Sequence, residues 1–176
     1  MYLICGAQIE SWKMERSLEA RNKVWDLIKD IRVAMFVTQA ADGKLSARPM
    51  SAVNKEFSGA LWFMTAGESP KLDEVRASQN VLVAYAEPKD QNYVSVRGKA
   101  EIVTDKAKIR ELWSEAARVW FPKGPDESDI ALIRMDVESA EYWDAPSATM
   151  VYAYGYVKAR LTGEPPDIGE TKKVGF

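Results

Sequence analysis

The sequence predicts a mainly β domain with peripheral helices, an α+β fold arranged as a small antiparallel barrel. Short runs of strand-forming residues recur along the chain between turn signals, and the clearest turn is Asp42-Gly43. The regular strand–helix–strand alternation of a doubly wound parallel sheet does not occur in the pattern. Because closing an antiparallel sheet removes its exposed edges, a barrel is the simplest arrangement for these strands.

The order of elements follows from hydrophobic periodicity and from turn residues. Helices are expected over residues 14–31, 71–78, 104 or 105 to about 120, and 147 to about 161. Strands are expected over residues 33–38, 44–53, 60–65, 81–86, 93–103, 130–137 and 141–144. A loop containing Pro and Gly is expected at 122–126.

A chain of 176 residues is long enough for one domain with a substantial core. Residues 14–162 are predicted to form that domain. Residues 1–13 are expected to be a disordered lead or extension, and residues 163–176 are expected to be the polar C-terminal tail of the same domain.

The composition excludes several classes of function. With 47% hydrophobic and 28% charged residues, the chain is typical of soluble globular proteins. Its net charge of −2 argues against broad nucleic-acid binding, and it has no apolar run of the roughly 20 residues that a membrane span needs. Cys5 is the single cysteine, so no intrachain disulfide is possible, and a reducing, cytoplasmic location is expected.

The chain contains no histidine. This absence excludes the usual Ser-His-Asp and Cys-His catalytic arrangements and most zinc sites, so no metal site is predicted. Acid–base chemistry would have to come from Tyr, Lys, Asp, Glu or a cofactor. The scattered glycines form no Gly-rich phosphate loop, so a bound nucleotide would have to be held by other groups.

A set of polar side chains between residues 48 and 71 suggests such a site. Arg48 lies on one predicted strand, Thr65 on the next, and Ser69-Pro70-Lys71 at a predicted helix start. Two cations, two hydroxyls and a helix N-terminus favour an anion such as phosphate. The neighbouring Pro49 and Met50 would give an apolar wall for a flat ring. On spacing alone, surface cations and an ordinary helix cap explain this pattern better.

The order of three motifs adds weight to the site. Arg48-Pro-Met-Ser51, Leu61-Trp-Phe-Met-Thr65 and Ser69-Pro-Lys71 resemble the FMN-binding split barrels related to pyridoxamine 5′-phosphate oxidase, and most closely their general stress protein 26 branch. The resemblance runs from about Glu15 to the C-terminus. It includes the segments Val96-Arg-Gly-Lys-Ala-Glu101, Tyr142-Trp-Asp144 and Gly169-Glu-Thr-Lys-Lys173.

The resemblance implies an antiparallel split β-barrel that forms a homodimer, with FMN bound at the subunit interface. Arg48 and Lys71 would contact the FMN phosphate, assisted by Thr65 and Ser69. The remaining residues implied to bind or face the cofactor are Pro49, Met50, Ser51, Phe63, Met64, Tyr93, Ser95 and Trp143, the last from the other subunit and several through backbone atoms.

Ordinary roles compete with some of these assignments. Trp143 fits a core or interface aromatic equally well, and Tyr93 fits a plain strand residue slightly better. Trp113, Trp120 and Phe121 are interpreted as core or dimer packing.

The sequence departs from the pyridoxamine-phosphate oxidases at the substrate. Those enzymes carry a C-terminal Arg-Leu-His-type signature, and this chain has no histidine, so that activity is not expected. Two functions remain: an FMN-dependent oxidoreductase of unknown substrate, reduced by NAD(P)H or another donor, and a non-catalytic flavin-binding stress-response protein. A deazaflavin or haem cofactor is a remoter alternative, and the lack of histidine argues against haem.

Overall fold

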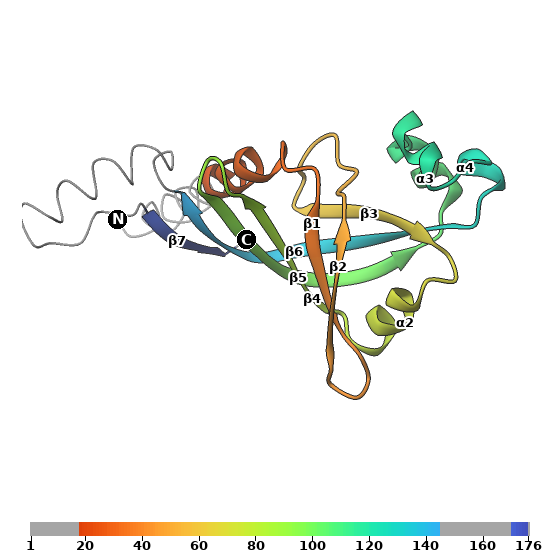
Figure 1. The fold of residues 1–176 in the computed structure, drawn as a ribbon, viewed down its shortest axis with the longest axis horizontal. Helices are drawn as coiled ribbons and strands as arrows, with labels where there is room; N and C mark the ends of the chain where they lie inside the picture. Colours follow the sequence, from red (N-terminus) through yellow and green to blue (C-terminus); the bar gives the residue numbers. More distant parts are fainter. Residues whose placement is uncertain (1–17, 145–169, 176) are drawn as a thin grey trace, which may run out of the picture. The chain divides into compact units, whose positions relative to one another are not determined.

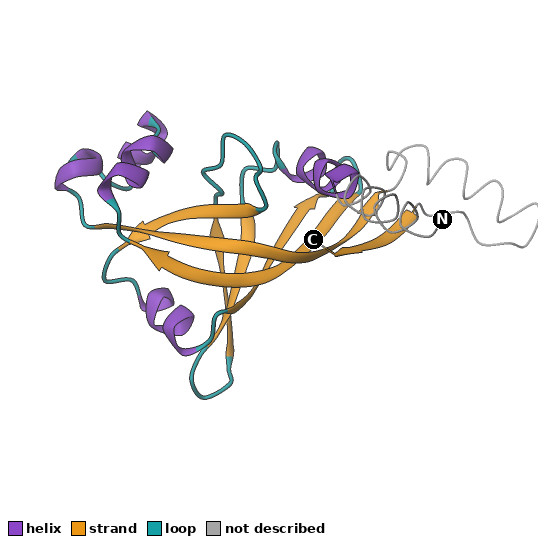
Figure 2. Cartoon of the chain, turned by 180° about the vertical axis from the view of Figure 1, so that it is seen from behind, coloured by secondary structure: helices purple, strands orange, loops and turns teal. Residues whose placement is uncertain are grey.

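The computed structural model describes residues 18–144 and 170–175. The helices are residues 18–28, α2 (Pro70–Ala77), α3 (Lys106–Leu112), α4 (Gly124–Glu127) and a 3-10 helix over Glu115–Val119. The strands are β1 (Ala34–Gln39), β2 (Leu45–Met50), β3 (Ala60–Ala66), β4 (Asn80–Glu87), β5 (Asn92–Val103), β6 (Ile130–Asp144) and β7 (Glu170–Gly175) (Figures 1 and 2). Within the described ranges, no helix is both long and apolar enough to cross a membrane.

The strands form one sheet in the order β2-β1-β4-β5-β6-β3, with β7 also paired to β6. β1 is antiparallel to β2 and β4, and β6 is antiparallel to β3 and β7. Among the described strands no ladder joins β2 to β3, so the sheet is not closed. The chain just after β2 reaches β3 through a bridge between Ala52 and Phe63 and a 2.8 Å hydrogen bond from Val53 N–H to the Trp62 carbonyl. The predicted mainly β, antiparallel fold is confirmed.

The β1–β2 hairpin turns at the predicted position. Gly43 has φ of +84° and donates its N–H to the Ala40 carbonyl at 2.9 Å, and the Asp42 carboxylate accepts from the Lys44 N–H at 3.1 Å. A positive φ explains why glycine occupies the turn. The resulting register places Arg48 opposite Phe36, which puts both side chains on the inner face of the hairpin.

The chain divides into two compact units. The larger unit comprises residues 32–84 and 96–138. In its core the rings of Phe36 and Phe63 meet edge to face at 5.0 Å. A second group of buried side chains lies where α3 packs on β6 and consists of Ile109 and Leu112 of α3 and Ile130 and Leu132 of β6.

The other unit contains residues 18–31, 85–95, 139–144 and 170–175 of the described chain. Its helix buries Val24 and Ile28, four residues apart on one face. The Asn92 side-chain amide donates to the Leu27 carbonyl near the helix C-terminus at 2.7 Å. The helix is therefore held both by its apolar face and by a hydrogen bond to its end.

Two expectations about the C-terminal strands are wrong. Residues 130–144 form one strand rather than two, and the predicted polar tail contains β7. β6 pairs with β3 through Asp136 and with β7 from Ser139 onward. Because β7 pairs with β6 beyond the segment that pairs with β3, β6 continues through the break expected between the two predicted strands.

The helix expected up to residue 120 is also wrong in part. Asp105 caps α3 as predicted, because its side chain accepts from the Ala107 N–H at 2.8 Å. However, α3 ends at Leu112, and Trp113 is extended, with its ring 6.5 Å from that of Phe121. A 3-10 helix follows, and α4 occupies part of the predicted loop. Packing of Trp113 thus overrides the helical periodicity. The helix expected at 147–161 lies outside the described residues.

Candidate functional site

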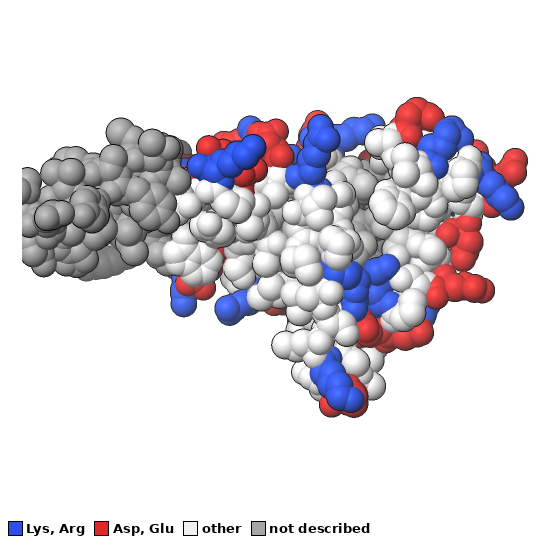
Figure 3. All heavy atoms as spheres, in the orientation of Figure 1, with Lys and Arg blue, Asp and Glu red and all other residues white. Residues whose placement is uncertain are grey.

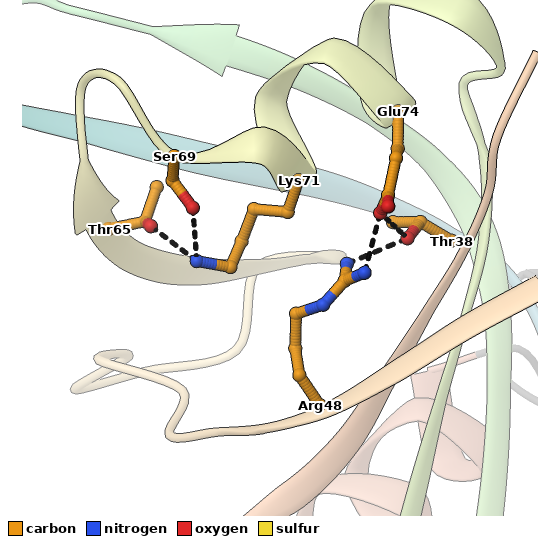
Figure 4. Close-up of polar contacts among 6 residues, drawn as sticks. All are labelled: Thr38, Arg48, Thr65, Ser69, Lys71 and Glu74. Carbon is orange, nitrogen blue, oxygen red and sulfur yellow. Dashed lines mark hydrogen bonds and ion pairs between the residues drawn. The ribbon is translucent and has the colours of Figure 1, made fainter.

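Four of the predicted site residues converge in the larger unit (Figure 4). Arg48 comes from β2, Thr65 from the end of β3, and Ser69 and Lys71 from the start of α2. In the drawing, the Lys71 ammonium lies beside Thr65 and Ser69, and the Arg48 guanidinium lies beside Thr38 and Glu74. We call these four residues, together with Thr38 and Glu74, the cation cluster.

Lys71 is held by hydroxyl groups. Its Nζ donates to Thr65 Oγ1 at 2.8 Å and to Ser69 Oγ at 2.6 Å. Thr65 is buried, whereas Lys71 and Ser69 are half-buried. Lys71 forms no ion pair with any carboxylate of the described residues. Its charge is therefore solvated in part by neutral groups that can still donate their own hydrogens.

The local sequence explains how Ser69 becomes available. Pro70 occupies the first turn of α2, and Ser69 is the N-cap by position, with an extended backbone. The expected capping by its side chain is not observed, because the hydroxyl accepts from Lys71 instead. The loop before it is tight: a Cβ on Gly67 would collide with the Asp129 carboxylate. A larger residue at position 67 would therefore require the exposed Asp129 side chain to move.

Arg48 is held by an acid and a hydroxyl that the sequence analysis missed. Its Nη1 donates to Thr38 Oγ1 at 2.7 Å, and its Nη2 donates to Glu74 Oε2 at 2.5 Å. The Thr38 hydroxyl donates to the same Glu74 oxygen. The side chains of Arg48 and Glu74 are 21% and 18% exposed, so this ion pair is largely shielded from solvent.

Its spacing from Lys71 could have indicated Glu74 as a member of the cation cluster. It lies three residues after Lys71, and residues three apart share one face of a helix. Thr38 is less accessible to sequence reasoning, because its role depends on the register between β1 and β2.

The electrostatics of the cluster favour an anion beside Lys71. Burial, and then the nearby Arg48 cation, lower the pKa of Lys71, and the Glu74 carboxylate opposes this shift. The hydrogen bond from Thr38, followed by the hydrogen bond and charge of Arg48, lowers the pKa of Glu74 despite burial. A further negative group near Lys71 would relieve the repulsion between the two cations. On the face drawn in Figure 3, Lys and Arg side chains are otherwise interspersed with Asp and Glu.

The apolar residues predicted to line a ring do not all lie on the same face of their strand. Phe63 is fully buried against Phe36. Met64 points to the opposite face of β3 and packs on the buried group where α3 packs on β6. Side chains on opposite faces of a strand cannot line one surface, so Phe63 and Met64 cannot both contact a single ring through their side chains.

The same alternation separates the predicted residues on and after β2. Met50 is buried on the inner face with Arg48, whereas Pro49 and Ser51 are exposed. Pro49 lies opposite Met35, on the outer face of the hairpin.

Three predicted residues belong to the other unit. Tyr93 and Ser95 share one face of β5, with Tyr93 exposed and Ser95 half-buried. Trp143 is exposed on β6, where its backbone pairs with Thr171 of β7. Their part in any site stays a prediction.

Comparison with known proteins places the chain in a family. A family model for "Pyridoxamine 5′-phosphate oxidase like" proteins matches residues 19–167. A candidate general stress protein 26 from Jannaschia sp. CCS1 superposes with a TM-score of 0.73 and 28% identity, covering 90% of this chain and 99% of that one. The general stress FMN/FAD binding protein of Xanthomonas citri superposes with a TM-score of 0.62 and 26% identity, covering 72% and 89%.

Protein bli-3 of Neurospora crassa is 23% identical over 149 residues, which span 80% of this chain and 71% of that protein. These matches agree with the motif order that the sequence analysis identified. The chain belongs to the pyridoxamine 5′-phosphate oxidase-like family, and its structural neighbours include general stress protein 26 proteins.

Proposed function

We propose that this chain binds FMN and that the cation cluster holds the FMN phosphate. The observation that carries the proposal is the state of Lys71: a half-buried ammonium with lowered pKa, beside a second cation and bonded, among the described residues, to hydroxyls alone. A related protein from Xanthomonas citri, which binds FMN/FAD by its name, supports a flavin as the ligand class.

The chemistry of the donors fits a phosphate. Thr65 and Ser69 accept from Lys71 and can donate their own hydrogens to phosphate oxygens. Arg48 uses one N–H on each of its two terminal nitrogens and has others left for an anion. The start of α2 adds the positive end of the helix dipole, although Pro70 has no N–H and the Leu72 N–H already donates to the Ser69 carbonyl at 2.9 Å.

Bound FMN would supply hydride or electron transfer, while the protein binds and orients it. We propose an FMN-dependent oxidoreductase of unknown substrate as the function, with NAD(P)H or another donor as reductant. A non-catalytic flavin-binding stress-response protein is the alternative.

We further propose a homodimer with the cofactor at its interface, for which the side chains of Val119 and Trp120, each 80% exposed, offer apolar surface. Sedimentation of a monomer at micromolar concentration would contradict the dimer.

Comparing FMN with riboflavin tests the phosphate site, because the two ligands differ only in the phosphate. We expect the protein to bind FMN more tightly, by on the order of tenfold to a hundredfold, as charge-assisted hydrogen bonds would give. Lys71→Ala should remove most of that preference and leave riboflavin affinity unchanged. Lys123→Ala, which removes the same charge from an exposed position at the start of α4, is the matched control.

Each outcome of these titrations contradicts a different part of the proposal. A protein that takes up no flavin on titration contradicts the cofactor. A protein that binds FMN and riboflavin equally contradicts the phosphate site alone. Titrating FAD alongside FMN shows which nucleotide the site prefers.

Anaerobic mixing of the FMN-loaded protein with NADH or NADPH distinguishes an enzyme from a binder. Rapid bleaching of the flavin absorbance is expected for an oxidoreductase that uses either donor. Absence of bleaching with both favours the non-catalytic protein or a different donor.

A further inference from the structure

Glu74 connects helix α2 to the β1–β2 hairpin. Its Oε2 accepts from Arg48 Nη2 of β2 at 2.5 Å and from the Thr38 hydroxyl of β1. The Ser46 hydroxyl, on β2 opposite Thr38, also stabilises the carboxylate. Two donors from the hairpin, Arg48 and Thr38, thus meet one acceptor oxygen on the helix that carries Lys71 (Figure 4).

Glu74 therefore determines where the guanidinium of Arg48 lies. A long arginine side chain has many rotamers, and fixing it requires specific partners. Thr38 and Glu74 each accept a hydrogen bond from one of its two terminal nitrogens. Each of these nitrogens keeps a second N–H group that can donate. In this position the guanidinium is close enough to Lys71 to lower the pKa of the lysine.

We propose that Glu74 is a positioning residue of the phosphate site: by anchoring Arg48 beside Lys71 it lets both cations act on one anion. The inference rests on the proposed function. Glu74 contacts no phosphate itself, since its negative charge would repel one, and its effect is transmitted through Arg48.

Removing Glu74 has two opposite effects on anion binding. The cluster gains net positive charge, which strengthens binding, and Arg48 loses its anchor, which weakens binding. Glu74→Gln and Glu74→Ala remove the same charge, but only the glutamine keeps an acceptor oxygen. Because both observed bonds end on the single oxygen Oε2, one carboxamide oxygen can replace it. The difference between the two variants isolates positioning.

We expect Glu74→Ala to bind FMN about tenfold more weakly than Glu74→Gln, as the loss of a hydrogen bond to a charged group would give. Glu74→Gln should bind FMN at least as tightly as the unmodified protein. Riboflavin affinity should be the same in all three. Asp73→Ala, which removes a neighbouring exposed carboxylate of α2 that pairs with Arg76, should change neither affinity.

A double-mutant cycle tests whether Glu74 acts on FMN binding through Arg48. In the Arg48→Ala background, the difference between Glu74→Gln and Glu74→Ala should vanish. A merely structural role would persist in that background and would lower riboflavin affinity in parallel. Circular dichroism and thermal unfolding establish that each variant is folded.

Equal FMN affinities for Glu74→Gln and Glu74→Ala would overturn the positioning role, as would a parallel loss of riboflavin affinity. These results remain distinct from failure of the proposed function, which would appear in the unmodified protein as no preference for FMN over riboflavin.

Discussion

The two cations of the cluster are held by different kinds of partner. Arg48 has a carboxylate, whereas Lys71 has two hydroxyls. An ion pair largely satisfies the first charge, while the second remains short of negative charge and has a lowered pKa. An added anion would therefore be stabilised most beside Lys71. Arg48 contributes further positive potential from a fixed position.

The lowered pKa of Lys71 predicts how FMN affinity depends on pH. The Lys71 ammonium, which is proposed to bind phosphate, is lost as pH rises through this lowered pKa, with Arg48 promoting and Glu74 opposing the loss. FMN affinity should therefore begin to fall at a lower pH than an ordinary lysine would give. Riboflavin, which has the same ring, corrects for titration of the flavin itself. Lys71→Arg should abolish the decline, because arginine stays protonated; an unchanged decline in that variant would exclude Lys71 as its source.

Glu74 predicts a contribution to acid sensitivity. Its pKa is lower in the folded protein than in the unfolded chain. The carboxylate therefore adds stability that is fully present above the unfolded pKa and is lost as pH falls through the folded pKa. Urea unfolding of the flavin-free protein between neutral and strongly acidic pH should show a smaller decline for Glu74→Gln than for the unmodified chain. Asp73→Asn should keep the full decline, and identical curves for Glu74→Gln and the unmodified chain would contradict the assignment.

At the scale of elements, Gly98 marks a close approach between β5 and β6. It is buried, and a Cβ there would collide with the backbone carbonyl of Asp136. Because backbone cannot move aside as a flexible side chain can, Gly98→Ala should lower the free energy of unfolding by roughly 1–3 kcal/mol. Urea denaturation measures this loss.

Gly175 provides the matched control for that substitution. It lies in β7, where a Cβ would meet nothing within 4 Å. Gly175→Ala should leave the midpoint of urea unfolding nearly unchanged. Equal effects of the two substitutions would show that the contact with Asp136 relaxes easily.

Sequence reasoning located the elements whose signals are local. β1 to β5 follow from alternating apolar residues and from turns such as Asp42-Gly43, and α2 follows from Ser69-Pro70. The continuity of β6, the presence of β7 and the early end of α3 depend on partners distant in sequence. The same distinction holds for the cation cluster: Arg48 and Lys71 were found from motifs, whereas Glu74 became evident only when the hairpin and the helix were seen together.

At the scale of the whole molecule, all residues of the cation cluster belong to one compact unit. A ligand that binds only the folded state stabilises it by mass action. FMN at a hundred times its dissociation constant should raise the free energy of unfolding by about 2.7 kcal/mol. Differential scanning fluorimetry at equal concentrations should show a larger rise in Tm with FMN than with riboflavin. Lys71→Ala should remove most of the difference between the two shifts, and an undiminished difference would place phosphate recognition elsewhere.

The β1–β2 hairpin has a consequence for how this sequence can change over generations. Its tip at Gly43 faces open space, so added residues there disturb no packing. One residue inserted between the tip and Arg48 would instead turn Arg48 to the outer face, away from Thr38 and Glu74. The turn should therefore accept changes of length more readily across descendants of this chain than strand β2, where a single added residue reverses the face on which Arg48 lies.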